Sequence, residues 1–534
     1  MNRTWLLVFT FIALAAVFVI AKSAGRRHPT PPGNSSEAST GFDNITIEIA
    51  TDPDNKQHAA DRKFFDEVEQ LTPDGLGPIY NAQSCRECHQ NGGQNPPAPA
   101  SAEPVSGAAS QVVEERAGHL GSNGTFEAPV VQIEGDIIVG RTLINDRAIC
   151  QRAQERVPET ETILTNRLAL STLGDGFIEA VADQTLLDIQ KQQCNSAGGI
   201  CGVAIWVPVL EAPGAENKRL GRFGWKDQHA SLLSFSADAY LNEMGVTSRL
   251  QPDEVTLVCN PAVSPVKPPA KPPAGAVTEP NSQPDPNDSN LEDIDHFARF
   301  MRATKAPPRD ASLAAAAGAM RGEKLFRDIG CAICHVSNMR TAPPGTKLNG
   351  GTFNVTEALG NKVFHPYSDF LLHDVGTGDG IAIAAVEHYG RGVARQLNVH
   401  DAAKLGRSAE TPVDATALPA MHDKSTVQKE TAPKPPQQPA VYTQGACDSR
   451  TLAVSERSAT ESLFYRTIQC AANKLRTPPL WGLHMRSRLM HDGNSLQIGD
   501  AIKRHKGEAV AVIDKFNHTS DQGKQEVIAF LNSL

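Results

Sequence analysis

A chain of 534 residues is too long to fold around one ordinary hydrophobic core, so we expect two or more domains. Apolar residues make up 40% of the sequence, which is typical of soluble globular proteins. The formal net charge of −9, together with the lack of a basic tract, argues against nucleic-acid binding.

The N-terminus carries an apolar run of 17 residues, from Trp5 to Ala21, preceded by Arg3. Its length lies between that of a signal-peptide core and that of a full membrane span. We therefore expect residues 1–24 to be either a signal peptide or an uncleaved anchor that tethers the protein to a membrane. Polar residues rich in Pro, Ser and Gly follow and predict a flexible tether at 25–42. Either reading predicts a periplasmic or other extracytoplasmic location.

A Cys-x-x-Cys-His motif follows at Cys85, Cys88 and His89. Two cysteines at this spacing can bind the two vinyl groups of one haem, and the adjacent histidine can then ligate the iron. A structural zinc site would need a second pair of ligands, and no pair with that spacing follows. A redox disulfide would leave the histidine without a role. The motif therefore predicts a covalently attached haem c.

The same motif recurs 246 residues later, at Cys331, Cys334 and His335. A helical pattern runs into it from residue 314, and another helical pattern precedes that at 291–304. The two copies predict two haems and suggest duplication of a haem-binding unit. Covalent attachment of haem outside the cytoplasm also agrees with the N-terminal export signal.

Two Pro-rich segments with few bulky apolar residues predict a linker at 260–290 and a surface insertion at 407–440. The linker divides the chain into a first cytochrome c-like haem domain at 43–259 and a second at 291–534. Few strand patterns occur, and the clearest is "VVQIEGDIIVG" in the first half. The expected fold is mainly α with long loops and minor β.

Six cysteines lie outside the two motifs. Four precede the linker and two follow it, so the cysteines of each half can pair internally in an oxidising compartment. Unpaired buried thiols are the alternative. The six are Cys150, Cys194, Cys201, Cys259, Cys447 and Cys470.

Several stretches around the motifs resemble the di-haem oxidoreductase family, whose members are also labelled peroxidases or thiol oxidoreductases. They are "GLGPIYNAQSCRECHQNGG", "GDGFIEAVAD", "GRFGWK", "HPYSDFLLHDVGTGDG" and "RTPPLWGLHMRSRLMHDG". The family is related to the bacterial di-haem cytochrome c peroxidases, and the resemblance covers most of residues 60–534. It implies an electron-entry haem with two protein ligands and a reactive haem that meets peroxide or oxygen. It also implies a calcium ion between the halves, for which the sequence names no ligands.

The second half resembles the electron-entry side. Relatives carry the distal ligand on the helix after the "HDG" turn, and the matching residue here is His505. Ile498, Ala501, Ile502 and His505 also share one apolar stripe of a helix predicted at 496–508. A lone histidine on such a stripe is usually a core residue, but a nearby haem makes it a candidate ligand. Rival ligands for this haem are Met490, Met485 and His491.

The first haem is the candidate reactive one. No histidine or methionine lies between His119 and His229, so the resemblance leaves its sixth position without an obvious ligand. An open iron is what an enzyme needs for its substrate. His58, His119, His229 or Met244 remain as alternatives that could close the position.

Peroxide chemistry needs a group that moves a proton between the two oxygen atoms. Within "GDGFIEAVAD" the candidate is Glu179, with Asp175 and Asp183 as weaker alternatives, because burial near a haem raises a carboxyl pKa. Trp225 is either an electron-transfer residue between the haems or an ordinary interface aromatic. A further candidate group at the second haem or the domain interface comprises Tyr367, Asp369, His373 and Asp374. Val375 stands where relatives can carry a methionine.

These observations predict an exported di-haem c-type oxidoreductase. Electrons from a small donor protein, a cytochrome or a cupredoxin, would enter at the His335/His505 haem. They would pass to the His89 haem, which would reduce hydrogen peroxide. The alternatives are a non-catalytic electron-transfer cytochrome c and a di-haem oxygenase that uses dioxygen.

Overall fold

The computed structural model describes residues 56–71, 74–89, 113–119, 129–134, 136–139, 141–196, 198–212, 217–252, 254–259, 291–381 and 471–534. The predicted N-terminal segment, tether, linker and insertion lie outside these residues, as do Cys447 and Cys470. Within the described ranges, no helix is long and apolar enough to cross a membrane.

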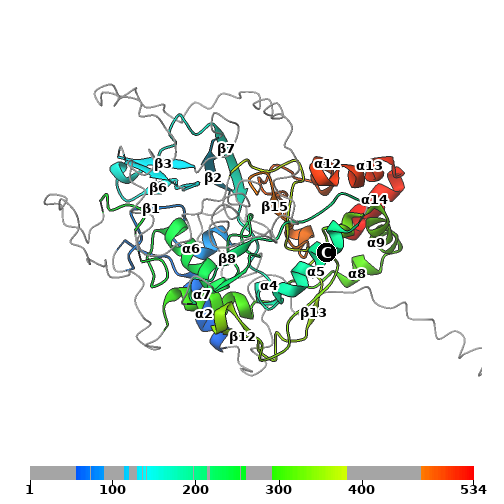
Figure 1. The fold of residues 1–534 in the computed structure, drawn as a ribbon, viewed down its shortest axis with the longest axis horizontal. Helices are drawn as coiled ribbons and strands as arrows, with labels where there is room; N and C mark the ends of the chain where they lie inside the picture. The colour runs from blue at the N-terminus through cyan, green and yellow to red at the C-terminus, as the bar shows by residue number, and fades with distance from the viewer. Residues whose placement is uncertain are drawn as a thin grey trace, which may run out of the picture.

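The elements before the linker position the first motif (Figure 1). The helices are α2 (Lys56–Asp66), α3 (Cys85–Cys88), α4 (Asp175–Glu179), α5 (Asp183–Cys194) and α6 (Leu232–Met244), with a 3₁₀ turn at Gln151–Ala153. The strands are β1 (Ile79–Tyr80), β2 (Val113–Gly118), β3 (Val130–Ile133), β4 (Asp136–Val139), β5 (Leu143–Ile144), β6 (Arg147–Ala148), β7 (Ile163–Leu168), β8 (Trp206–Pro208) and β9 (Lys218–Leu220).

The elements after the linker position the second motif. The helices are α7 (Asp293–Ala303), α8 (Ala311–Ala315), α9 (Ala317–Ile329), α12 (Ile498–Arg504), α13 (Val510–His518) and α14 (Asp521–Leu531). Single 3₁₀ turns occur at Cys331–Ile333, Asn349–Gly351, Leu483–Met485 and Gly507–Ala509. The strands are β10 (Met339–Arg340), β11 (Lys347–Leu348), β12 (Phe353–Asn354), β13 (Val363–Phe364), β14 (Leu372–His373) and β15 (Leu475–Arg476).

The fold is mixed α and β, so the expectation of a mainly α protein with minor β needs correction. The strands form antiparallel pairs and one three-stranded sheet with the order β5-β2-β7. The β3–β4 hairpin, which pairs Val130 with Val139, confirms the one strand pattern seen in the sequence. Most of the other strands have two to six residues and pair with partners far along the chain. Such short strands show too little alternation to be recognised locally.

The described residues do not separate into two cores at the linker. Helix α7, the first after the linker, packs against α2 and α6 of the first half. Phe297 and Phe300 of α7 contact Phe65 of α2, and Phe297 also meets Tyr240 of α6 edge-on. The clean division into two cytochrome c-like domains is therefore not what the packing shows, because α7 completes the core under the first motif.

The predicted helices around the second motif are confirmed. Helix α7 begins with a capping box between Glu292 and Asp295. Helix α9 leads into the motif and ends at Gly330, whose φ of 110° is favourable for glycine. Helix α14 closes the chain against α9, and the two lie side by side in Figure 1. Gly322 permits this approach, since a Cβ there would lie 1.8 Å from the Glu526 carbonyl oxygen.

Two disulfides confirm pairing within the first half. Cys150 bonds to Cys259, and Cys194 at the end of α5 bonds to Cys201. The four motif cysteines carry free thiols. The thiols required for two covalent haems are thus left available.

Candidate haem sites

The second motif forms one wall of a cavity. After Gly330 the chain turns through Cys331–Ile333 and presents His335. The Nδ1 atom of His335 lies 3.0 Å from the carbonyl oxygen of Tyr367, so Nδ1–H donates and Nε2 keeps its lone pair. Burial, assisted by the charge of His505, lowers the pKa of His335 to about 4. A neutral imidazole with a free Nε2 is the form that ligates haem iron.

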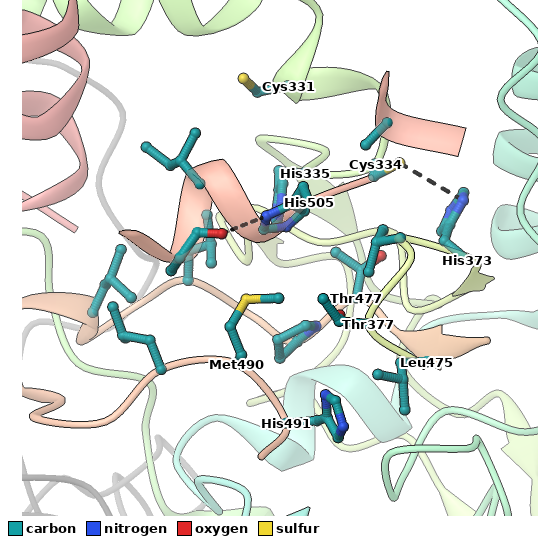
Figure 2. Close-up of a pocket in the computed structure, with 18 of the residues that line it drawn as sticks. Cys331, Cys334, His335, His373, Thr377, Leu475, Thr477, Met490, His491 and His505 are labelled. Carbon is teal, nitrogen blue, oxygen red and sulfur yellow. Dashed lines mark hydrogen bonds between the residues drawn. The ribbon is translucent and has the colours of Figure 1, made fainter. Parts of the chain in front are cut away.

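His505 faces the same cavity. It caps the C-terminus of α12 and its Nδ1 lies 2.8 Å from the carbonyl oxygen of Ala501, which again leaves Nε2 as the free ring atom. Burial lowers its pKa. Figure 2 shows the imidazoles of His335 and His505 beside each other, below Cys331 and Cys334. The predicted helix at 496–508 is shorter than expected, because it ends at Arg504 and His505 already has extended backbone angles.

The rest of the lining suits a haem. It is largely apolar, and Ile498, Ala501 and Ile502 of α12 belong to it as the stripe predicted. The hydroxyl oxygen of Thr377, also in the lining, is buried and has no hydrogen-bond partner among the described residues. Arginine side chains can pair with carboxylates such as haem propionates. The lining contains three of them, Arg476, Arg486 and Arg488.

Two of the three rival ligands also line this cavity. Met490 adopts a φ of 67°, and His491 has a buried Nδ1 without a hydrogen-bond partner. In Figure 2 both lie farther from Cys331 and Cys334 than the His335–His505 pair. Met485 is not among the lining residues. The geometry favours His505 as the second ligand.

The "HPYSDFLLHDVG" stretch lies at the edge of this site. His373 is buried between Asp369 and Glu508, at 2.9 and 3.0 Å, and its Nδ1 lies 3.7 Å from the sulfur of Cys334. Burial opposes its protonation, but the charge of Asp369 outweighs burial and raises its pKa well above the usual value. The grouping of Cys334, Asp369 and His373 has the spacing of metal ligands. Its donors do not suit Ca²⁺, which takes six to eight oxygen ligands.

The first motif is held by a short helix. Ser84 caps α3 by accepting a hydrogen bond from the backbone N–H of Glu87. The Nδ1 atom of His89 lies 2.8 Å from the carbonyl oxygen of Leu170, and burial lowers the histidine pKa. His89 therefore has the same arrangement as His335, with Nε2 left for iron.

Three of the four alternative ligands for this site are engaged with other groups. His58 stacks on Phe300, and its Nε2 lies 3.0 Å from the Thr304 hydroxyl. His119 pairs with Glu161, and His229 pairs with Asp238. Met244 is buried in the core cluster against which Cys85 packs, so it stays an alternative ligand. Among the described residues, the site thus has one histidine placed to ligate iron, whereas the second site has two.

One short segment joins the two sites. Leu168, Ala169, Leu170 and Ser171 line the second cavity, and Leu170 also accepts the hydrogen bond of His89. Trp225 lines the cavity as well, and its indole N–H donates to Leu168 at 2.7 Å. Its ring meets His491 edge-on at 6.2 Å. Trp225 therefore lies in the connection between the sites, which agrees with both of its sequence-based interpretations and leaves its electron-transfer role a prediction.

A family model described as "Di-haem oxidoreductase, putative peroxidase" matches residues 121–392. The chain belongs to this di-haem oxidoreductase family. The matched range contains the second motif and the connecting segment, while the first motif and His505 lie outside it.

A solved structure of hydrazine synthase from Kuenenia stuttgartiensis is also similar. The match has 17% identity and a TM-score of 0.19, and covers 46% of this chain and 58% of that chain. A likeness this weak supports no argument about the fold. No curated protein matches the sequence.

In this di-haem oxidoreductase Glu179 is fully buried and held by ionic and hydrogen bonds. Its carboxylate accepts from the guanidinium of Arg302 at 2.6 and 3.0 Å, from Asn349 at 2.9 Å and from the backbone N–H of Leu232 at 2.9 Å. Burial opposes ionisation, but Arg302 outweighs it and lowers the pKa of Glu179. The expected rise in pKa is therefore not found, and the acid–base role of Glu179 stays a prediction.

The two alternative carboxyls differ. Asp183 forms ion pairs with Arg219 and Arg222. Asp175, at the start of α4, is buried, and burial raises its pKa to about 7 against the opposing charge of Arg476. Because Arg476 lines the second cavity, this carboxyl lies near that cavity.

Two buried polar groupings near the sites had no signal in the sequence. One pairs Asp379 with Arg167 at 2.7 Å and with Lys226 at 2.8 Å. The other joins Tyr240 to Glu69 and Asp293. Their members come from segments that are far apart in the chain, so no local pattern could have revealed them.

Proposed function

We propose that this di-haem oxidoreductase is an exported enzyme that reduces hydrogen peroxide with electrons from a small redox protein. Electrons enter at the site of His335 and His505, and the site of His89 uses them in pairs. The asymmetry between the sites carries this proposal, since one site presents two histidines and the other presents one. Each haem, when bound, supplies one-electron redox chemistry, and a haem with an open position also binds a small oxidant.

The residues between the sites support transfer from the second to the first. The segment Leu168–Ser171 touches the second cavity and the ring of His89, so electrons need not leave the protein interior. Ligation by two histidines gives the entry haem a lower potential than ligation by a histidine and a methionine. A low potential suits a haem that passes its electron on to the first haem.

Peroxide reduction consumes two protons with two electrons and yields two water molecules. A group that exchanges a proton near neutral pH is therefore needed close to the reacting site. Asp175, with its pKa of about 7, exchanges a proton near neutral pH more readily than the ion-paired Glu179. We assign Asp175 as the candidate proton donor and acceptor, with Glu179 holding α4 against Arg302 of α7.

The decisive experiment is spectroscopic. Visible and electron paramagnetic resonance spectra of the holoprotein, oxidised and half-reduced, with and without cyanide, report the ligation of each haem. One low-spin haem beside one that binds cyanide supports the proposal. Two low-spin haems that ignore cyanide in both redox states would make the protein an electron carrier without catalysis.

A variant pair then tests which site reacts. His89→Gly is expected to abolish peroxide-dependent oxidation of a reduced cytochrome or cupredoxin donor, while the spectrum of the second haem persists. His518→Gly is the matched control, because His518 makes the same contact from Nδ1 to a backbone carbonyl but is exposed. Turnover that survives in His89→Gly would show that the reactive site is misassigned. Fractionation of cells that express the full chain tests the export.

A further inference from the structure

A buried tyrosine hydroxyl lies between two carboxylates beneath the first motif. Tyr240 of α6 is 2% exposed, and its hydroxyl oxygen lies 2.9 Å from Oε1 of Glu69 and 2.9 Å from Oδ2 of Asp293. Glu69 follows α2 and Asp293 is the first residue of α7. Three separate segments thus bring one donor to two acceptors.

The proton count of this group is constrained by its geometry. A phenol has one hydrogen and can donate it to one carboxylate at a time. At 2.9 Å the second carboxylate oxygen would face a lone pair of the hydroxyl oxygen unless that carboxyl is protonated. The group is therefore satisfied when one of its two carboxyls holds a proton. Burial, reinforced by the negative charge of Asp293, raises the pKa of Glu69 to about 8.

The surrounding charges favour retention of that proton. Glu67 and Asp74, like Asp293, add negative charge at Glu69. Three other acidic groups on α2 and α7 are already matched by cations. These are Asp61 with His296 and Arg299, Asp66 with Arg62 and Arg86, and Asp295 with Arg249.

Glu69 is tied directly to the haem-attachment segment. Its backbone N–H donates to the carbonyl oxygen of Gln83 at 2.7 Å, and the Gln83 amide donates back to its carbonyl oxygen at 3.1 Å. Gln83 lies two residues before Cys85. Burial raises the pKa of the Cys85 thiol, and the charge of Glu69 raises it further, so the two side chains interact electrostatically. A change of charge on a haem attached at Cys85 must therefore change the proton affinity of Glu69.

The opposite end of the group reaches toward solvent. Asp293 is half-buried in the first turn of α7, and Glu67 beside it is exposed, whereas Glu69 is 5% exposed. The contacts therefore run from the half-buried Asp293 through Tyr240 to Glu69, and from the Glu69 backbone to the first motif.

We propose that Glu69, Tyr240 and Asp293 form a proton-exchange site of the first haem, which takes up a proton when that haem is reduced. A proton from water binds Asp293 and moves to the Tyr240 oxygen as the Tyr240 proton moves to Glu69, so no net charge is created at the tyrosine. The delivery of this proton to peroxide rests on the proposed function. The uptake of a proton when the first haem is reduced does not depend on the proposed function.

The test is the midpoint potential of the haem attached through Cys85 and Cys88 as a function of pH, in the holoprotein. For the wild type we expect the potential to fall as the pH rises toward about 8, the pKa of Glu69. Glu69→Gln should remove most of this dependence, and Asp293→Asn, at the half-buried end, should weaken it. Glu159→Gln, an exposed carboxyl that is not among the charges acting on Glu69, is the control and should leave the pH dependence intact. An unchanged pH dependence in both Glu69→Gln and Asp293→Asn would overturn the proposal.

A kinetic measurement separates this inference from the proposed function. Tyr240→Phe keeps the ring packed against Phe297 but removes the shared proton, so haem reduction should lose part of its solvent deuterium isotope effect. If the wild type fails to turn over peroxide while Glu69→Gln still abolishes the pH dependence, the proton-exchange site stands and the peroxidase proposal falls. If peroxide turnover is found and Tyr240→Phe leaves the isotope effect unchanged, the relay through the tyrosine is refuted.

Discussion

The Nδ1 atom of His89 donates to the carbonyl oxygen of Leu170 at 2.8 Å, while the Leu170 residue itself lines the cavity that contains His335 and His505. One residue therefore contacts His89, the candidate ligand of the first haem, and lines the cavity of the second motif. Trp225 reinforces this connection through its hydrogen bond to Leu168. The orientation of His89 and the shape of the second cavity thus depend on the same backbone segment.

The first prediction concerns electron transfer through this connection. Trp225→Phe removes the indole N–H donor and part of the aromatic surface, so transfer from the second haem to the first should slow several-fold. The buried carbonyl of Leu168 loses a partner, which should lower the free energy of unfolding by about 1 kcal/mol. Stopped-flow oxidation of the half-reduced protein measures the rate. Trp206→Phe is the control, because Trp206 is 47% exposed on β8. Equal rates in both variants would remove Trp225 from the path.

The second prediction concerns the ligand from α12. His505→Met should raise the potential of the second haem while keeping it low-spin, since a methionine ligand stabilises the reduced iron. His505→Ala should lose the low-spin signature, provided that Met490 cannot replace it, so the variant is combined with Met490→Leu. The measurements are a redox titration and the electron paramagnetic resonance spectrum.

The control for this prediction is His491→Asn. His491 lines the same cavity, yet its substitution should leave the low-spin signal of the second haem unchanged. Loss of that signal in His491→Asn, with retention in His505→Ala, would move the ligand assignment to His491.

The third prediction concerns the buried ion pairs of Asp379. Arg167 and Lys226 both pair with this carboxylate, and all three side chains are buried. Asp379→Asn leaves two buried cations without their counter-charge, so the free energy of unfolding should fall by about 3–5 kcal/mol. Denaturation followed by circular dichroism measures the loss. Asp328→Asn, which breaks an exposed pair with Lys324 in α9, should change stability by less than about 0.5 kcal/mol. Similar losses of stability in the two variants would show that burial of the ion pair does not determine how much stability is lost when the pair is broken.

The sequence predicts those features of the fold and the site that a local pattern of residues encodes. The motif spacing gives Cys331, Cys334 and His335, and the apolar stripe places His505 toward the cavity, because helical periodicity is a short-range property. The same holds for α7 and the β3–β4 hairpin. The resemblance to a family added the expectation that His505 is a ligand, which the shared cavity supports.

What could not be predicted depends on contacts between distant segments. Glu179 was expected to have a raised pKa because a buried carboxyl usually does, but Arg302, which is 123 residues away, reverses the shift. The packing of α7 under the first motif likewise follows from tertiary contacts with Phe65 that no local pattern encodes. Local patterns therefore predict the candidate haem-attachment residues but not the buried polar groups that pack around them.

The last prediction concerns stability as a function of pH. Glu243, at the end of α6, accepts from the Asn81 amide at 2.8 Å, and burial together with the charge of Glu114 raises its pKa from 4.5 to about 8. Between these two pH values the native state binds more protons than the unfolded state, so the free energy of unfolding falls as the pH rises from 4.5 to 8. Glu243→Gln mimics the protonated form and should remove this part of the decline.

The comparison is made by urea denaturation of the holoprotein at several pH values across that interval. Glu243→Gln should have a flatter profile than the wild type and be the more stable of the two near pH 8. Glu87→Gln serves as the control, because Glu87 of α3 is a carboxyl close to the first motif whose pair with Arg147 is exposed on both sides. Since Glu243 also raises the pKa of the Cys88 thiol, the effect should be read in protein with the haem already attached. A wild-type profile that rises between these pH values, or parallel profiles for wild type and Glu243→Gln, would show that Glu243 does not hold its proton in the folded state.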